Sequence, residues 1–259
     1  MLEILSSIPE KPVGAIVFAH GICHGAWCWH HFMDFFSSHG YACYALSYCG
    51  HGKSDGKKGL IKNNAEDVAE VVEKATGFKP YLIGHSMGGA VVQKYAGDNH
   101  ESLSGLILLA SATAPKMPYL KTIASLTKPD MWLSYKKAMG WKVNSLQGAS
   151  FFTGSKSGVS EDDMILAEEM LEDESKRVLM LDLYRRYSKN YKLSCPVLVI
   201  GSSTDAYFPE KSLEQTRDTY KKAGTSVEYV LLDGLCHDIM LDRRWEEAAE
   251  KILHFCERR

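Results

Sequence analysis

Ser86 stands at the centre of the pattern GHSMG at residues 84–88. The pattern follows a short apolar run and opens a helical one, which is the strand–turn–helix context that a nucleophilic serine requires. Glycines two positions before and after the serine let strand and helix pass closely, so that the turn projects the hydroxyl above a sheet. We therefore predict that Ser86 is a catalytic nucleophile rather than a serine that caps a helix.

A serine hydroxyl needs a base to remove its proton, and that base needs an acid to orient it. In nucleophile turns of this kind, the acid and the histidine follow the serine in that order along the chain. His237 lies in a glycine-containing loop after the last predicted strand, whereas His254 falls on the solvent side of the final predicted helix. Asp205 follows the preceding strand, and the strand before that one ends without an acid. The predicted triad is therefore Ser86, Asp205 and His237.

Acyl transfer also needs two backbone N–H groups aimed at the developing oxyanion. One belongs to Met87, directly after the nucleophile, and the other comes from the loop after the first strong strand. Gly21 permits a sharp turn in that loop, so we assign the second donor to Ile22. This machinery predicts a serine hydrolase that acts on carboxylic esters and requires no cofactor.

The elements that must position these residues alternate between strand and helix. Helical stripes of apolar residues occupy residues 63–76 and 245–256. The strand-like runs are nearly continuous rather than alternating, which is typical of strands buried on both faces of a parallel sheet. They lie at residues 13–20, 42–48, 80–84, 105–110, 196–201 and 226–232, with an edge strand at 2–8. The pattern predicts an α/β fold with a mostly parallel central sheet and helices on both faces.

One connection, at residues 112–195, is much longer than the others. It is rich in bulky apolar residues and carries helical patterns at residues 121–140 and 161–187, and a structureless loop of this size would be uncommon. We interpret it as a helical cap over the carboxyl edge of a core formed by residues 1–111 and 196–259. It could also be simply the core of a small helical subdomain, and both descriptions can hold. We assign the substrate pocket to Gly21, His85, Trp132 and Phe151.

The composition limits the classes of partner. The chain has 259 residues, of which 45% are hydrophobic and 24% charged, and its net charge is −2. Without a long basic run, nucleic acid is not expected as a partner. No apolar run approaches about 20 residues, so no stable membrane insertion is expected, and the N-terminal residues do not resemble a signal peptide. Seven scattered cysteines favour reduced thiols and a cytoplasmic protein. The oligomeric state stays open, a homodimer included.

Histidines and cysteines gather near the first strong strand and raise the question of a metal site. They are His20, Cys23, His24, Cys28, His30 and His31. Their spacing is only loosely similar to that of known zinc sites, and the segment is already explained as an oxyanion loop that runs into a helix. We therefore expect no metal.

With these motifs the chain resembles the α/β-hydrolase superfamily. HGICHGAWCW at residues 20–29 is similar to a segment of plant methylesterases and hydroxynitrile lyases, and GHGKSDG at 50–56 resembles a loop of monoacylglycerol lipase-like hydrolases. GHSMGG at 84–89 resembles the family's nucleophile turn, and HDIMLD at 237–242 its histidine segment. The resemblance covers roughly residues 13–111 and 196–256, and it implies the triad named above. The intervening segment matches no pattern, so the substrate is described only as a small to medium hydrophobic ester.

Two positions separate this chain from the lyases that it resembles. Gly21 stands where those lyases have a threonine, and Asp238 where they have a lysine that supplies positive charge near the departing cyanide. Both differences favour hydrolysis. A lyase, thioesterase or perhydrolase with the same triad stays an alternative, as does a ligand receptor on a hydrolase scaffold. Asp233 and Asp238 flank His237 too closely to reach its ring easily, and we expect both at the loop surface.

Overall fold

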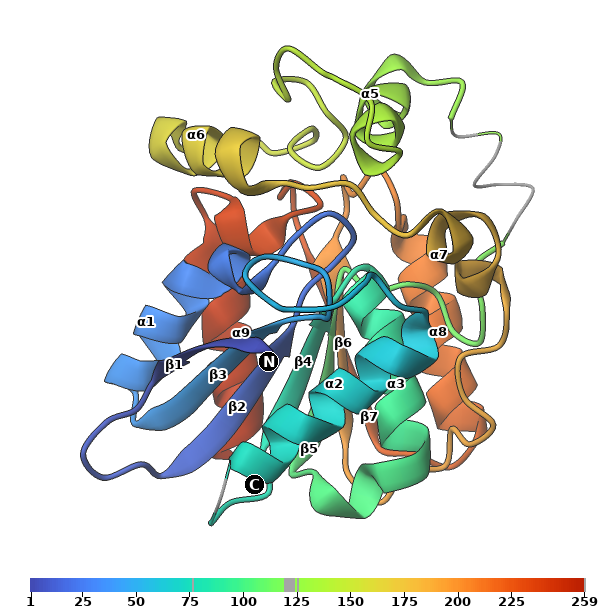
Figure 1. Cartoon of the computed structure of the whole chain (residues 1–259). Coiled ribbons are helices and arrows are strands. Elements are labelled where there is room, and N and C mark those ends of the chain that lie inside the picture. Colours follow the sequence, from blue (N-terminus) through green and yellow to red (C-terminus); the bar gives the residue numbers. More distant parts are fainter. Residues whose placement is uncertain (76, 119–123, 125, 259) are drawn as a thin grey trace.

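A seven-stranded sheet forms the centre of the computed structural model, which describes residues 1–75, 77–118, 124 and 126–258. The strand order is β1-β3-β2-β4-β5-β6-β7, and only β1 runs antiparallel to its neighbour β3 (Figure 1). All seven predicted strands begin and end within one residue of the observed ones, and their pairing confirms the mostly parallel sheet. The strands are β1 (Glu3–Ser7), β2 (Gly14–Ala19), β3 (Tyr41–Ser47), β4 (Tyr81–His85), β5 (Gly105–Leu109), β6 (Val197–Ser202) and β7 (Val227–Leu232).

Helices cover both faces of this sheet. Against one face lie α1 (His30–Ser38) and α9 (Trp245–Glu257), and against the other lie α2 (Ile61–Lys74), α3 (Met87–Asn99) and α8 (Glu210–Lys222). Alternate strand residues serve the two faces: Ile16 and Phe18 pack in the first core, Ala15 and Val17 in the second. Burial on both faces explains why the strands read as continuous apolar runs. Short 3-10 turns complete the framework at η1 (Ala26–Trp29), η2 (His100–Ser102) and η4 (Ile239–Leu241).

Between β5 and β6 the chain leaves the sheet and passes over its carboxyl edge (Figure 1). This stretch contains α5 (Pro129–Ala138), α6 (Glu161–Met170), α7 (Lys176–Met180) and η3 (Asp182–Tyr184). Pro129 stands in the first turn of α5, where its missing N–H costs no helical bond. Ser160 caps α6 by accepting a hydrogen bond from the Asp163 N–H at 3.0 Å.

The helix predicted over residues 161–187 is interrupted after Met170. The intervening residues make contacts with the core instead of helical bonds: the Glu172 N–H donates to the Cys23 carbonyl at 2.9 Å, and the buried Glu174 pairs with His51 at 3.1 Å. Of the helix predicted over 121–140, residues 121–123 and 125 lie outside the described residues. Residue 76, the predicted end of the first helix, lies outside them as well.

The insertion shares its apolar packing with the sheet. Phe151 and Leu171 belong to the cluster that contains Phe18, while Val178 and Leu183 belong to the cluster on the opposite face. It therefore completes both cores at the carboxyl edge. None of the helices among the described residues is long and apolar enough to cross a membrane.

Candidate active site

Ser86 occupies a strained turn between β4 and α3, with φ 51° and ψ −119°. Such a conformation persists only where the surroundings enforce it. A Cβ on Gly84 would lie 2.4 Å from Val92 Cγ2, and one on Gly88 would lie 2.3 Å from the Ala19 carbonyl oxygen. Only glycine permits this close passage of strand and helix. The serine therefore lies at the N-terminus of α3, whose dipole favours negative charge.

Asp205 and His237 form a buried pair at the ends of β6 and β7. His237 Nδ1 lies 2.9 Å from Asp205 Oδ2, and Asp205 Oδ1 accepts from the N–H groups of Tyr207 at 2.7 Å and Phe208 at 3.0 Å. Because β6 and β7 are parallel neighbours, their carboxyl ends bring the two loops together. With Nδ1–H donated to the carboxylate, Nε2 is the free proton acceptor of the ring.

The charges around His237 favour its protonated form. Burial by itself lowers the pKa of His237, but the charge and hydrogen bond of Asp205, together with Asp238, outweigh it and hold the pKa above its ordinary value. The neighbouring His85 behaves in the opposite way: burial and His237 lower the pKa of His85 to about 3. The predicted base, His237, and His85, which precedes the predicted nucleophile, are thus two histidines whose pKa values move in opposite directions.

A cavity with an uncharged lining lies next to Ser86. The core contributes Ile22, Ser86, Met87, Tyr207 and Phe208 to its wall. The rings of Tyr207 and Phe208 lie 4.5 and 5.5 Å from the ring of His237. No residue in this described lining carries a formal charge. The insertion supplies the rest of the wall with Met117, Leu126, Met131, Ser134, Tyr135, Ala138, Leu179, Leu183 and Tyr184.

The four residues that we assigned to the pocket from the sequence lie around this cavity but are not in its described lining. Gly21 and His85 lie behind it, since a Cβ on Gly21 would be 3.0 Å from Ser86 Cβ and 2.9 Å from His85 Nδ1. Phe151 is buried and stacks on Tyr207, while Trp132 is 38% exposed and stacks on Tyr135.

Sequence reasoning missed the face that α5 presents to the cavity. Met131, Ser134, Tyr135 and Ala138 recur at spacings of three and four, which is one stripe of a helix. Trp132 lies off that stripe. The spacing marks these residues as one face of a helix, but only the tertiary structure decides that this face meets the cavity.

Asp233 is exposed, as expected, but the prediction was wrong for Asp238, whose side chain is fully buried. Asp238 Oδ2 lies 2.9 Å from His24 Nε2, and the Asp238 N–H donates to the Phe151 carbonyl at 3.0 Å. Burial by itself raises the pKa of Asp238, but His24 and the neighbouring histidines outweigh it and hold the pKa below its ordinary value. Because Asp238 directly follows His237, its carboxylate does not bond the His237 ring and instead bonds the ring of His24.

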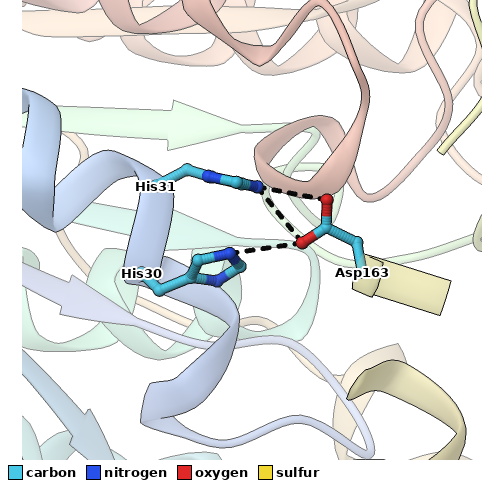
Figure 2. Close-up of side chains that lie close together, drawn as sticks. All are labelled: His30, His31 and Asp163. Atoms are coloured by element: carbon cyan, nitrogen blue, oxygen red, sulfur yellow. Dashed lines mark hydrogen bonds and ion pairs between the residues drawn. The ribbon is translucent and has the colours of Figure 1, made fainter. Parts of the chain in front are cut away.

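The histidine and cysteine cluster of the sequence separates into two groups. His20 and His24 lie in the loop that carries Ile22 and are buried, and the Tyr48 N–H donates to His20 Nε2 at 3.2 Å. His30 and His31 instead face Asp163 of α6 (Figure 2). None of the seven cysteines, all of which lie within the described residues, forms a disulfide.

Comparison with known proteins places this geometry in a family. Residues 10–244 match the family described as serine aminopeptidase, S33. Monoacylglycerol lipase from Mycolicibacterium smegmatis is 34% identical over 108 residues, which cover 39% of each chain. Methyl jasmonate esterase 1 from Vitis vinifera is 36% identical over 88 residues, which cover 32% of this chain and 33% of the relative. The chain thus spans less than half the length of these curated relatives.

Solved structures extend the likeness to the whole fold. A highly thermostable carboxyl esterase from Bacillus coagulans superposes with a TM-score of 0.74 at 20% identity, over 99% of this chain and 93% of the esterase. At this identity the likeness concerns the fold alone. Since the family model spans most of the chain and the sheet has the matching architecture, the chain belongs to the serine aminopeptidase S33 family and has the α/β-hydrolase fold.

Proposed function

We propose that this chain is a serine hydrolase that cleaves small to medium-sized hydrophobic carboxylic esters. The observation that carries the proposal is the buried Asp205–His237 pair, joined at 2.9 Å, whose flanking rings line the same uncharged cavity as Ser86. An uncharged wall suits alkyl and aryl groups, because burying an unpaired charge is costly. The names of the relatives, a lipase and an esterase, support the same class of substrate.

In the proposed first half-reaction, Ser86 Oγ attacks the ester carbonyl carbon while His237 Nε2 takes the hydroxyl proton. The carbonyl π electrons move to its oxygen, which accepts hydrogen bonds from the Ile22 and Met87 N–H groups. Asp205 holds the His237 ring and stabilises the imidazolium. His237 then protonates the departing alkoxide oxygen as the carbon–oxygen bond breaks, and the acyl group remains on Ser86.

In the second half-reaction, water replaces the alcohol. His237 removes a proton from the water as its oxygen attacks the acyl carbon, the same two N–H groups hold the second oxyanion, and Ser86 leaves with the proton from His237. Every proton moves between Ser86, His237, the leaving alcohol and water, so the proposal requires no cofactor.

The proposal assigns the two parts of the chain different tasks. Residues 1–111 and 196–259 form the catalytic core, and residues 112–195 form a helical cap whose side chains select the ester. Cysteines that form no disulfide suit a reducing compartment, so we place the enzyme in the cytoplasm, with a small-molecule ester as its partner.

The test is turnover of a p-nitrophenyl ester panel of graded acyl length by wild type and Ser86→Ala. We expect the variant to lose turnover by at least about 10⁴-fold while its melting temperature stays unchanged. Ser203→Ala, an exposed serine outside the cavity, is the matched control and should retain wild-type rates. Wild-type-like turnover by Ser86→Ala would overturn the proposal.

The alternatives give different outcomes in the same experiment. A fluorophosphonate that labels Ser86 without multiple turnovers on any ester indicates a receptor on this scaffold. Product analysis separates a lyase, a thioesterase and a perhydrolase from an esterase. Hydrolysis of amino-acid p-nitroanilides would indicate an aminopeptidase, but the described cavity lining offers no carboxylate for a substrate ammonium group.

A further inference from the structure

Asp238 joins three loops that the proposed reaction uses. Its carboxylate is fully buried, directly after the proposed base in the chain. Oδ2 lies 2.9 Å from Nε2 of His24, in the loop after β2, and Oδ1 lies 3.6 Å from Nε2 of His85, the last residue of β4. The carboxylate thus contacts the loop of the oxyanion donor and the turn of the nucleophile.

His24 carries this connection to Ile22. His24 Nδ1 lies 2.6 Å from the Ile22 carbonyl oxygen, so both ring nitrogens face oxygen acceptors and Nδ1–H donates to that carbonyl. The ring also stacks on Trp27 at 5.5 Å and meets the Phe151 ring edge-on at 5.8 Å. The ring thus anchors the peptide on the C-terminal side of Ile22, while His20 Nδ1, 2.8 Å from the Gly21 carbonyl oxygen, holds the peptide that carries the Ile22 N–H.

His85 completes the connection. Its Nε2–H donates to the His237 carbonyl at 3.1 Å, and the residue that follows His85 is Ser86. The base loop and the nucleophile turn are therefore joined through backbone and side chain next to the same carboxylate. Neither His24 nor Asp238 is in the described cavity lining, so neither is placed to touch a substrate.

We propose that His24 and Asp238 are positioning residues that hold the Ile22 oxyanion donor in register with Ser86 and His237. This inference rests on the proposed function of Ser86. Because removal of one member of a buried ion pair leaves the other unpaired, the test uses near-isosteric amides: Asp238→Asn, His24→Asn and His24→Gln. Asp233→Asn, an exposed acid in the same loop, is the matched control.

The two amides at position 24 separate positioning from general stability. The amide N–H of an asparagine can take the place of Nδ1–H and keep the bond to the Ile22 carbonyl. The longer glutamine places its amide near Asp238 instead, and the bond to the Ile22 carbonyl is lost. We expect kcat of His24→Gln and Asp238→Asn to fall about 10–100-fold, below the full loss of an oxyanion donor, and kcat of His24→Asn to fall at least about threefold less than that of His24→Gln. KM should change less than about threefold, since neither residue touches the ester. Asp233→Asn should match wild type.

A trifluoromethyl ketone, which forms a tetrahedral adduct on a catalytic serine, gives the second readout. Its inhibition constant should rise in His24→Gln and Asp238→Asn by the same factor by which kcat/KM falls, because both report the held oxyanion. If His24 and Asp238 only stabilised the fold, the loss of kcat in each variant would instead follow the drop in its melting temperature. Asp238→Asn combined with His24→Gln should lose little more than either variant alone, because residues that act as a unit are not additive.

The outcomes distinguish this inference from the proposed function. If Ser86→Ala is inactive but His24→Gln keeps wild-type kcat and ketone affinity, the positioning inference is wrong and the function stands. If Ser86→Ala keeps wild-type turnover, the proposed function is wrong. Should Asp238→Asn fail to fold, the contrast between His24→Asn and His24→Gln decides.

A different observation, on the outer side of the molecule, carries a second inference. His30 and His31 open α1, and Asp163 lies in the first turn of α6 (Figure 2). His30 Nε2 lies 3.2 Å from Asp163 Oδ1, and His31 Nε2 lies 3.1 Å from both carboxylate oxygens. Two imidazoles from the core thus converge on one carboxylate of the insertion.

The surroundings orient each of these groups. His30 Nδ1–H donates to the Trp27 carbonyl at 3.3 Å, His31 stacks on Trp245 at 5.1 Å, and Ser160 Oγ donates to Asp163 Oδ2 at 2.5 Å. With Nδ1–H committed, a neutral His30 turns an Nε2 lone pair toward a negative oxygen, so either a proton on Nε2 or a metal ion lies between the two atoms. Histidine that donates its second ring N–H to a backbone carbonyl is the common arrangement around bound metals.

We propose that His30, His31 and Asp163 bind a divalent transition metal of the zinc type, which fastens α6 to α1. Ligand atoms about 2.0–2.1 Å from a tetrahedral zinc lie about 3.3 Å apart, close to the separations seen here. The imidazoles are 37% and 29% exposed, which leaves a path for the ion and room for water as a further ligand. The sequence-based expectation of no metal is revised for these two histidines.

Calorimetric titration of the EDTA-treated protein with Zn²⁺ tests this site, with Co²⁺ absorption reporting its geometry. We expect one site, a raised melting temperature with Zn²⁺, and affinity at least about tenfold weaker in Asp163→Asn and His31→Asn. His254→Asn, an exposed histidine on α9, should bind like wild type. Absence of binding, or equal affinity in all variants, would show that protons alone bridge the imidazoles and the carboxylate.

Discussion

The loops at the carboxyl ends of the strands and the insertion between β5 and β6 meet at one cavity but are built differently. In the loops, the backbone is held by strand ends, glycine contacts and buried pairs such as Asp205–His237. In the insertion, short helices present apolar side chains such as Met131 and Leu183. In the proposed function, the chemistry lies where the backbone is tightly held, and the selectivity lies where side chains can change without moving the backbone.

The largest effect should come from the acid of the triad. Asp205→Asn should reduce kcat by about 10⁴-fold, because an amide can hold the ring in the wrong tautomer and cannot stabilise the imidazolium. Steady-state turnover of a p-nitrophenyl ester measures it, with the exposed Asp218→Asn as control. A loss below about tenfold would remove Asp205 from the mechanism.

Next comes the packing of the nucleophile turn. A Cβ on Gly88 would lie 2.3 and 2.4 Å from the Ala19 and His20 carbonyl oxygens, so Gly88→Ala should lower the free energy of unfolding by about 3 kcal/mol or more. Gly224→Ala places its methyl group in open space at φ 89° and should cost only about 1–2 kcal/mol. Urea unfolding compares the two, and equal losses would contradict the close-packing argument.

The pH dependence should show the charges that surround His237. In the proposed mechanism neutral His237 is the active form. Because its pKa is raised, kcat/KM should reach half of its plateau above pH 6.5 and fall about tenfold per pH unit below that midpoint. Asp238→Asn should move the midpoint to lower pH, because Asp238 contributes to the raised pKa of His237, whereas Asp233→Asn should not move it. A midpoint that stays in place would show that the Asp238 charge does not reach His237.

The smallest effect should come from the insertion. Met131→Ala widens the cavity wall, so the ratio of kcat/KM for octanoyl over acetyl p-nitrophenyl esters should change about 3–10-fold with little change for acetate. Trp132→Ala, one residue off the lining stripe, should change that ratio less than about twofold. If Trp132→Ala changed the ratio more than Met131→Ala, Trp132 would belong to the pocket wall and the assignment of the α5 face would be wrong.

Much of the framework could be predicted because it depends on local rules. Because the strands are buried on both faces, each can be recognised in the sequence as a run of apolar residues. The glycines around Ser86 are required by close contacts at the strand–turn–helix unit. The pairing of Asp205 with His237 could be predicted as well, because it requires only that two parallel neighbours end at the same edge.

Other features could not be predicted, because they depend on contacts between segments far apart in the chain. Asp238 is buried because His24 and the Phe151 carbonyl, from two other segments, both bond to it. The interruption after α6 follows from Glu172 and Glu174 bonding to the core. The face of α5 that meets the cavity depends on how that helix rests on the sheet.

The sequence by itself determined the α/β alternation, the position of the strained serine turn and the order of serine, acid and histidine, since short-range sterics and periodicity control them. Only the tertiary structure decided which side chains wall the cavity, that Asp238 lies inside, and that His30 and His31 meet Asp163. Those outcomes depend on how the elements pack against one another, and the spacing of residues within one segment does not specify its contacts with distant segments.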